Sequence, residues 1–312
     1  YGLNRYDAYA FTTYLRNDSV QGNLSGNFIL SIYEDNDSVL WIGTDNAGLN
    51  RYDRGKDVFI TFKHDAAVGS SIQGNSVYDI LETSRNELLF ATEKGISVLN
   101  RQTESFYPFA LPSQQIDLSN MVVQDLYEDH DQSLWIGTDE GLIHYDTKKN
   151  QVDHFTYTPD NTHSISNNSI NQILRTSNGV LTVATNEGVN AYDDVDKTFT
   201  RFYYDSDSPN SRAKSEIQAM VEDNRGNRWF GSFGGGLIRA GNNDTDTEIF
   251  TVDPNNPHSI ESDYINALYF DETGILWIGT YGGGVNMIQQ VRIRFDHVSF
   301  EKNNPNSLAG KE

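Results

Sequence analysis

The sequence repeats itself about every 47 residues, and this repeat constrains the fold more than any other feature. The copies are LWIGTD at 40–45, LLFAT at 88–92, LWIGTD at 134–139, LTVAT at 181–185, RWFGS at 228–232 and LWIGT at 276–280. We call the second residue of each copy the register position, which is Trp41, Leu89, Trp135, Thr182, Trp229 and Trp277 in turn. Internal self-similarity at this period is typical of solenoids and propellers.

Other positions keep the same step. Twelve residues before the register positions stand Ile29, Val77, Val123, Ile170, Ile217 and Ile265. Nine residues before them stand Ile32, Ile80, Leu126, Ile173, Met220 and Leu268. All twelve are aliphatic or methionine, so the period extends over a whole structural unit and is not confined to one short word.

Each unit predicts four strands. In the first, residues 29–34 form an apolar run, 39–43 carry a tryptophan and branched residues, 49–52 alternate in character, and 58–62 are rich in aromatics. Asp, Asn, Ser and Gly separate these runs, as β-turns require. Four strands in about 47 residues indicate an all-β fold, a β-propeller of four-stranded antiparallel blades. A linear β-solenoid is the competing architecture.

The two ends predict a divided blade. GLNRYD at 2–7 repeats GLNRYD at 48–53, so residues 1–16 are expected to form a half blade. Residues 289–312 are expected to supply an outer strand and the start of the next repeat. We therefore predict a single β-propeller over 1–312, with six complete blades centred on the register positions plus a partial seventh. Two alternatives would complete the partial blade: a ring that is closed by sequence outside this chain, or a longer tandem array of blades.

Composition excludes several partners and chemistries. The formal net charge of −21 and the pI near 4.5 disfavour nucleic acid and direct membrane contact by this region. The absence of cysteine rules out disulfides and thiolate chemistry. There is no apolar run of about 20 residues. The start at Tyr1 has no leader-like segment, so any signal peptide or anchor is expected outside this sequence.

The motifs resemble a known family. IYEDNDSVLWIGTDNAGLNRYD at 32–53, LYEDHDQSLWIGTDEGLIHYD at 126–146 and DPNNPHSI at 253–260 are similar to the two-component regulator propeller repeat. The resemblance covers the whole chain, although the repeats at Leu89 and Thr182 depart from the tryptophan pattern.

This resemblance implies a sensor. Propellers of the family usually form the extracytoplasmic, periplasmic part of an inner-membrane signalling protein whose output is a histidine kinase, often hybrid, or a diguanylate cyclase. It further implies a small-molecule or carbohydrate-like oligosaccharide ligand, or a partner domain, and leaves open a homodimer through the propeller or adjacent domains.

Two sets of residues are candidates for ligand binding. The loop after the register strand carries Asp45, Glu93, Asp139, Asn186, Phe233 and Tyr281, and the start of the inner strand carries Gln124, Asn171, Gln218 and Asn266. Carboxylates, amides and aromatic faces together suit sugar recognition. Ordinary loop decoration and a polar, water-filled channel are the alternatives. The four tryptophans, Trp41, Trp135, Trp229 and Trp277, are expected to be structural, packed between blades.

No motif predicts catalysis, a metal or a cofactor. The acidic turns lack the spacing of a calcium loop, and the glycine triplets 234–236 and 282–284 precede strands and not helices. The seven histidines show no ligand spacing, and no nucleophile motif occurs. We therefore expect a non-enzymatic ligand sensor. A propeller lyase or glycoside hydrolase, with Glu93 and Asp139 as the nearest acid pair, and a purely structural or dimerisation scaffold are the alternatives.

Overall fold

The computed structural model describes residues 2–7, 9–113, 116–202, 216–241, 246–289, 292–298 and 308. Within them, 26 strands form one two-stranded sheet and six four-stranded antiparallel sheets, in which consecutive strands are neighbours. The prediction of an all-β fold built from propeller blades is confirmed, and one short 3₁₀ helix, η1 (Leu118–Asn120), is the only helix of the described part.

The sheets follow the predicted repeats. The two-stranded sheet pairs β1 (Leu3–Tyr6) with β2 (Phe11–Tyr14). Blade 1 is β3 (Ile29–Glu34), β4 (Leu40–Thr44), β5 (Leu49–Asp53) and β6 (Val58–Phe62). Blade 2 is β7 (Val77–Glu82), β8 (Leu88–Thr92), β9 (Gly95–Asn100) and β10 (Ser105–Pro108). Blade 3 is β11 (Val123–Glu128), β12 (Leu134–Thr138), β13 (Gly141–Asp146) and β14 (Gln151–Phe155).

The later repeats are built in the same way. Blade 4 is β15 (Ile170–Arg175), β16 (Leu181–Thr185), β17 (Gly188–Asp193) and β18 (Thr198–Phe202). Blade 5 is β19 (Ile217–Glu222), β20 (Arg228–Ser232), β21 (Leu237–Ala240) and β22 (Thr247–Phe250). Blade 6 is β23 (Ile265–Phe270), β24 (Ile275–Thr280), β25 (Gly284–Gln289) and β26 (Arg292–Val298). The predicted start of a further repeat after 298 lies outside the described residues, except for Leu308.

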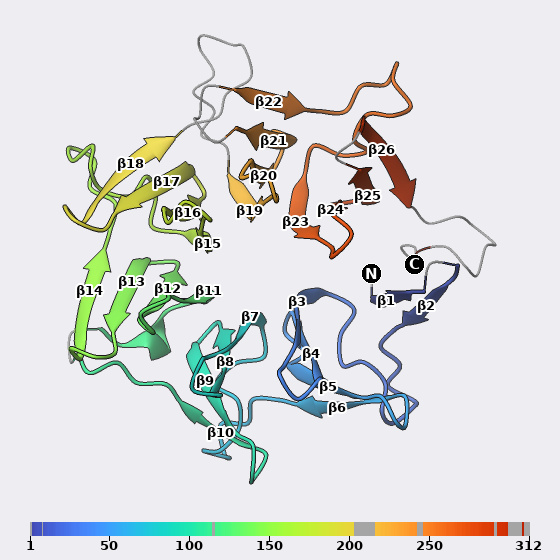
Figure 1. Cartoon of the computed structure of the whole chain (residues 1–312). Helices are drawn as coiled ribbons and strands as arrows, with labels where there is room; N and C mark the ends of the chain where they lie inside the picture. Colours follow the sequence, from blue (N-terminus) through green and yellow to red (C-terminus); the bar gives the residue numbers. More distant parts are fainter. Residues whose placement is uncertain are drawn as a thin grey trace. The chain divides into compact units, whose positions relative to one another are not determined.

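The chain divides into two compact units, one of residues 1–154 and 301–312, the other of residues 155–300. In the first unit, the innermost strands β3, β7 and β11 lie side by side, and in the second unit β15, β19 and β23 do the same (Figure 1). The last strand of each blade lies on the opposite side from its first strand. Each unit therefore contains a fan of three blades, and the first unit also contains the two-stranded sheet.

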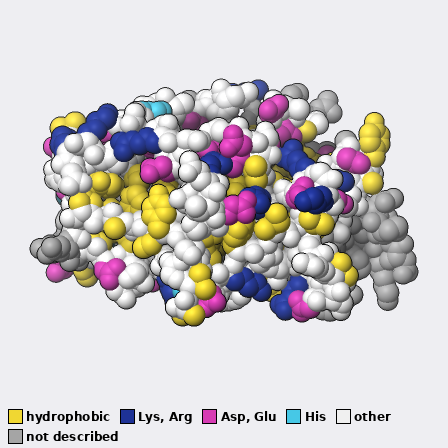
Figure 2. Space-filling view, turned by 90° about the horizontal axis from the view of Figure 1, so that it is seen from below, with side chains coloured by type: hydrophobic (Ala, Val, Ile, Leu, Met, Phe, Trp, Pro, Cys, Tyr) yellow, Lys and Arg dark blue, Asp and Glu magenta, His cyan; other side chains and the backbone are white. Residues whose placement is uncertain are grey.

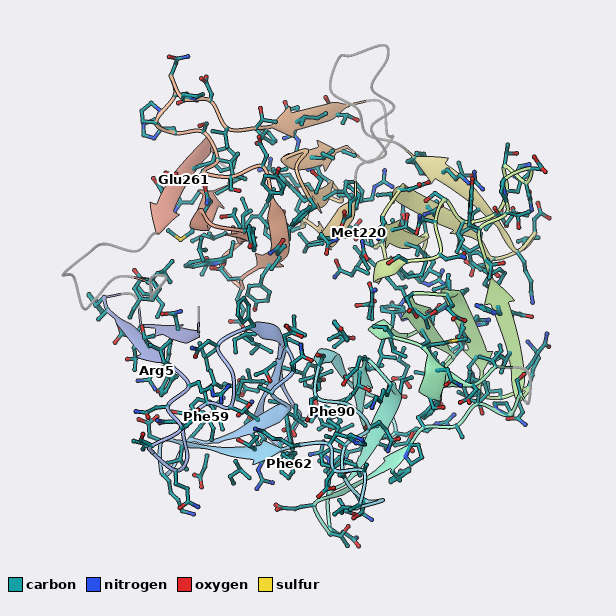
Figure 3. The ribbon with its side chains drawn as sticks, turned by 180° about the vertical axis from the view of Figure 1, so that it is seen from behind. Arg5, Phe59, Phe62, Phe90, Met220 and Glu261 are labelled. Atoms are coloured by element: carbon teal, nitrogen blue, oxygen red, sulfur yellow. The ribbon has the colours of Figure 1, made fainter. Side chains whose placement is uncertain are left out.

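The apolar core lies between neighbouring blades. In the first unit, Trp41 and Leu49 of blade 1 pack with Ile80 and Phe90 of blade 2, and all four are buried. Phe62 packs against this cluster on the same side as Phe90 (Figure 3). Its ring lies 6.0 Å from that of Trp41. Burial of large aromatic side chains dominates such an interface. No blade therefore completes its own core.

Every innermost strand carries a β-bulge. The pairing register shifts between the residues twelve and ten before the register position, for example between Val77 and Asp79 and between Ile217 and Ala219. The same shift occurs in the other four blades. A bulge leaves backbone groups outside the ladder of its own sheet, so they need partners elsewhere. The residue inside the bulge is the one that the sequence suggested for the channel wall.

Polar side chains of the preceding blade meet these backbone groups. Ser31 Oγ donates to Val77 O at 3.0 Å, and Asp79 Oδ2 accepts from Leu126 N–H at 2.9 Å. The glycine of the WIGT word allows the close approach: a Cβ on Gly43 would lie 2.4 Å from Val77 O. Blades 1, 3, 5 and 6 carry glycine at this position, whereas blades 2 and 4 carry Ala91 and Ala184.

The tryptophans occupy the junctions. Trp41, Trp135 and Trp229 are at most 3% exposed, and Trp277 is partly buried. Leu89 and Thr182, which replace tryptophan in blades 2 and 4, are also buried, at 0% and 1%. The departures from the pattern therefore change the size of the core residue and leave its burial unchanged.

Candidate ligand site

The candidate loop residues are held at one face of each unit. We call this the loop face; it carries the loop between the second and third strands of each blade and the segment that leads into the first strand. The two are joined by backbone hydrogen bonds, such as Asp45 N–H to Phe28 O at 3.0 Å and Tyr281 N–H to Tyr264 O at 2.8 Å. Each candidate side chain therefore starts from a fixed backbone.

In the first unit, the three candidate carboxylates accept hydrogen bonds from the leading segments. Glu93 accepts from the N–H groups of Asn75 and Ser76, at 2.8 and 2.9 Å. Asp45 Oδ1 accepts from Ser76 Oγ at 2.9 Å, and Asp139 Oδ1 accepts from Val122 N–H at 2.9 Å. Their hydrogen-bonding capacity is partly used within the protein, which is unlike a paired acid and base held ready for catalysis.

Tyr78 lies among these carboxylates. Burial raises the pKa of its hydroxyl, and the charges of Glu93 and Asp45, with a smaller contribution from Asp139, raise it further. Tyr78 also occupies the bulge of β7. This part of the loop face therefore carries negative charge around a phenol that stays protonated.

The amides on the innermost strands differ from one another. Asn171 donates from Nδ2 to Asn186 Oδ1 at 2.9 Å and to Ile217 O at 2.8 Å, so it links blades 4 and 5. Gln218 donates to Glu216 Oε1 at 2.6 Å. Gln124 is half-buried in the first unit, and Asn266 is exposed in the second. The first two amides have structural partners, and Asn266 presents its side chain to solvent.

In the second unit, the loop face gathers exposed aromatic rings. Phe233, Tyr264 and Tyr281 are 44%, 46% and 57% exposed. The ring of Phe233 lies 4.9 Å from that of Tyr264, edge to face, and 6.4 Å from that of Tyr281. We call these three residues the aromatic cluster. The structure thus joins two predicted residues to a third that the sequence analysis missed.

Tyr264 was missed because it stands just before the strand, where the other blades carry Phe28, Ser76, Val122, Ser169 and Glu216. The signal that could have found it is the pairing of this position with the loop. Phe233 and Tyr264 form an isolated antiparallel bridge between blades 5 and 6. The N–H groups of Gly234 and Gly236 both donate to Asp263 O at 3.0 Å, which fixes the loop beneath the rings.

The polar groups around the aromatic cluster are neutral or acidic in the described residues. They include Glu216 and Gln218 on blade 5 and Ser262 and Asp263 before β23. No group of three or more His, Asp or Glu side chains placed to hold a metal ion is found among residues that the structure describes. On the side of the molecule shown in Figure 2, acidic and basic side chains are interspersed. The arrangement suits a ligand that stacks on rings and hydrogen-bonds to amides and carboxylates.

A family model for the two-component regulator propeller matches residues 23–46, 117–140 and 259–282. These segments contain the register words of blades 1, 3 and 6. The chain carries two-component regulator propeller repeats. The first and last matches include the loop residues Asp45 and Tyr281, so candidate positions of both units lie inside propeller repeats of this family.

Solved structures share the fold of these propeller repeats. The extracellular domain of an inferred hybrid two-component system from B. thetaiotaomicron is 23% identical, with a TM-score of 0.76 over 92% of this chain and 37% of that one. The extracellular domain of an inferred one-component system from the same organism is 23% identical, with a TM-score of 0.50 over 95% and 38%. This chain therefore spans less than two fifths of either domain.

A third likeness comes from an enzyme. A catalytically inactive variant of virginiamycin B lyase from Staphylococcus aureus, solved with quinupristin, is 12% identical, with a TM-score of 0.61 over 86% of this chain and 83% of that one. A search of curated protein sequences finds no match. Among all the described residues, no helix is both long and apolar enough to cross a membrane.

Proposed function

We propose that this chain is a ligand-sensing propeller region of a bacterial signalling protein, and that it lies outside the cytoplasm. Two observations support the proposal: the regulator propeller repeats, and the fold likeness to extracellular domains of inferred two-component and one-component systems. The output, a histidine kinase or a diguanylate cyclase, would belong to the rest of such a protein. The region itself performs no chemistry in this proposal.

The ligand is carbohydrate-like and binds at the aromatic cluster. This rests on one observation, the three exposed rings of Phe233, Tyr264 and Tyr281 held on a fixed loop beside polar side chains. Exposed aromatic side chains are enriched at binding surfaces because they offer a large contact area at a small loss of conformational entropy. Amide and carboxylate groups nearby can bond sugar hydroxyls.

The lyase alternative has less support. A glycosidase pair needs two carboxyl groups free to act on one substrate. Glu93 is occupied by two backbone N–H groups and Asp139 by a third. None of the seven histidines stands at a candidate loop or strand position. The likeness to virginiamycin B lyase at 12% identity therefore extends to the fold alone.

A thermal-shift screen against a panel of neutral and acidic oligosaccharides tests the proposal. We expect a saturable rise in the melting temperature with one sugar class, because a ligand that binds only the folded state stabilises it. Tyr281→Ala should abolish this rise. Tyr107→Ala is the matched control, since Tyr107 is 47% exposed on β10 of the other unit. If no sugar shifts the melting temperature, or if Tyr281→Ala leaves the shift unchanged, the proposed site is wrong.

A further inference from the structure

Three of the four junctions between neighbouring blades within the two units are tied by two kinds of polar link. The first is the link between the bulge of one blade and a side chain of the blade before it. The second joins the end of an innermost strand to the turn of the preceding blade. For example, Glu82 at the end of β7 accepts from Asn36 N–H at 2.7 Å, in the turn between β3 and β4.

The second link recurs at two further junctions. Glu128 accepts from the N–H and the hydroxyl of Ser84, which joins blades 2 and 3. Glu222 accepts from the N–H and the hydroxyl of Ser177, at 2.6 and 2.8 Å, which joins blades 4 and 5. A hydrogen bond to an ionised carboxylate is stronger than one between neutral groups. At three junctions, a carboxylate at the end of one blade's first strand is therefore bonded to the turn of the preceding blade.

The first link is present at the same three junctions. Ser31 and Asp79 make it between blades 1 and 2 and between blades 2 and 3. Between blades 4 and 5 it is double: Asn171 donates to Ile217 O, and Gln172 Oε1 accepts from Met220 N–H. The middle of each of these junctions is thereby tied as well.

In the described part of the chain, the junction between blades 5 and 6 has neither of these two links. Ala219 stands where Gln172 stands in blade 4, and an alanine side chain can accept no hydrogen bond from Leu268 N–H. Phe270 stands where Glu222 stands in blade 5, so no carboxylate reaches back to the turn at Asn224. Leu268, which would meet the side chain at position 219, is also more exposed than its counterpart: it is only partly buried, whereas Met220 at the same position is 2% exposed.

The aromatic cluster lies across this same junction. Phe233 belongs to blade 5, and Tyr264 and Tyr281 belong to blade 6. On the loop face, the two blades are joined by the Phe233–Tyr264 bridge and by the bonds to Asp263 O. The two blades also share an apolar cluster that includes Trp229 and Leu237 of blade 5 and Ile265 and Leu276 of blade 6.

We propose that the junction between blades 5 and 6 is the compliant joint of the second unit, and that a ligand on the aromatic cluster acts by closing it. The inference rests on the proposed ligand site, but its test needs no ligand. Low local stability is what distinguishes the elements that move in regulation. A molecule that contacts Phe233 together with Tyr264 or Tyr281 binds the closed arrangement better and shifts the population toward it.

Because the chain lacks cysteine, a single engineered disulfide can be introduced to hold the joint closed in place of the ligand. Facing residues of an antiparallel bridge have Cα atoms about 4.5–5.5 Å apart, within the range that a disulfide spans. In Phe233→Cys/Tyr264→Cys, hydrogen exchange at the amides of β23 should be at least about five-fold slower in the oxidised than in the reduced protein. Equal exchange rates in the two states would overturn the proposal.

Restoring the missing links is the second test. Ala219→Gln/Phe270→Glu copies Gln172 and Glu222 into blades 5 and 6, and should slow exchange in β23 about as much as the disulfide does. The matched control, Gln172→Ala/Glu222→Phe, should speed exchange in β19 toward the rate of β23 in the native protein. If the amide of Leu268 exchanges as slowly as the amide of Met220 in the ligand-free native protein, the joint does not exist, whatever the sugar screen shows.

Discussion

Trp41 Nε1 donates a 2.9 Å hydrogen bond to Oδ2 of Asp35, six residues earlier, and both side chains are buried. The other carboxylate oxygen of Asp35 accepts from the N–H groups of Asp37 and Val39 and so shapes the turn between β3 and β4. One aspartate thus accepts hydrogen bonds both from the backbone of the turn and from the indole N–H of a core tryptophan. The same six-residue pairing recurs for Asp129 with Trp135, Asp223 with Trp229 and Asp271 with Trp277.

Trp41→Ala should lower the free energy of unfolding by about 3–5 kcal/mol, because it removes a large buried ring and leaves Asp35 without its indole partner. Urea unfolding followed by far-UV circular dichroism measures the change. Trp277→Ala is the control in the same repeat position, and because Trp277 is only partly buried its effect should be smaller. Equal losses for the two variants would contradict the burial argument.

Arg101→Ala should destabilise the protein by about 3 kcal/mol. Its guanidinium bonds Asp35 Oδ2 at 2.9 Å and Glu82 Oε1, and both carboxylates have side chains that are 0% exposed. Removing one partner of a buried ion pair leaves charge without compensation, although Arg101 is itself 25% exposed and water will offset part of the loss. Differential scanning calorimetry of the variant measures the loss.

Arg54→Ala provides the comparison for Arg101. Arg54 bonds Glu34 at 2.9 Å, but both side chains are about half exposed, at 54% and 49%. An exposed pair of this kind is worth about 1 kcal/mol or less. A loss at Arg54 as large as the one at Arg101 would mean that burial of the partners is not the deciding factor.

Gly43→Ala should destabilise the junction between blades 1 and 2 by about 2 kcal/mol or more. Its Cβ would lie 2.2 Å from Ser31 Oγ and 2.4 Å from Val77 O, so the next blade's backbone must shift. Gly69→Ala, where nothing lies within 4 Å, should leave the melting temperature nearly unchanged. The prediction fails if the two variants have the same melting temperature.

The pH dependence of stability should carry the signature of Asp79. Burial raises the pKa of its carboxyl from 3.8 to about 6, with hydrogen bonds from Ile80 and Leu126 N–H opposing the rise. The folded state therefore holds a proton that the unfolded state has released. The contribution of Asp79 is favourable at low pH and is lost as the pH rises from about 4 through 6.

Asp79→Asn isolates this effect, because asparagine keeps an oxygen acceptor for Leu126 N–H and does not titrate. The variant should be more stable than the native protein at pH 7.5, on the order of 2 kcal/mol, and similar to it at pH 4.5. Urea unfolding at the two pH values measures both differences. A variant that loses stability at pH 7.5 would show that the charged carboxylate is the better partner.

The repeat register predicted every four-stranded blade, because apolar positions at fixed offsets define which strands can share a core. It did not predict the bulges, since a bulge changes hydrogen bonding without changing the apolar pattern. The pairing of Asp35 with Trp41 was readable, however. Where Leu89 and Thr182 replace tryptophan, Thr83 and Thr176 replace the aspartate six residues earlier. Aspartate therefore stands at this position only in the repeats that have an indole N–H for it to accept from.

The candidate site was predicted in part. Phe233 and Tyr281 follow from the loop position alone, but Tyr264 joins them through a bridge between blades that no single-strand pattern contains. The carboxylates of Asp45 and Glu93 were predicted to face a ligand, and the structure engages them with Ser76 and Asn75. Residue type indicates what a side chain can bond, and only the fold determines which bonds are already made.

The links between blades have a consequence for how such proteins change by copying their own repeats. The innermost strand of blade 2 carries both Asp79, which ties the following blade, and Glu82, which ties the preceding one. Duplication of blade 2 would therefore add a junction with both links, whereas duplication of blade 6, with Ala267 and Phe270 at these positions, would add a junction with neither. Which junctions between blades can move is therefore set by the innermost strand of each copied repeat, independently of the loops that contact the ligand.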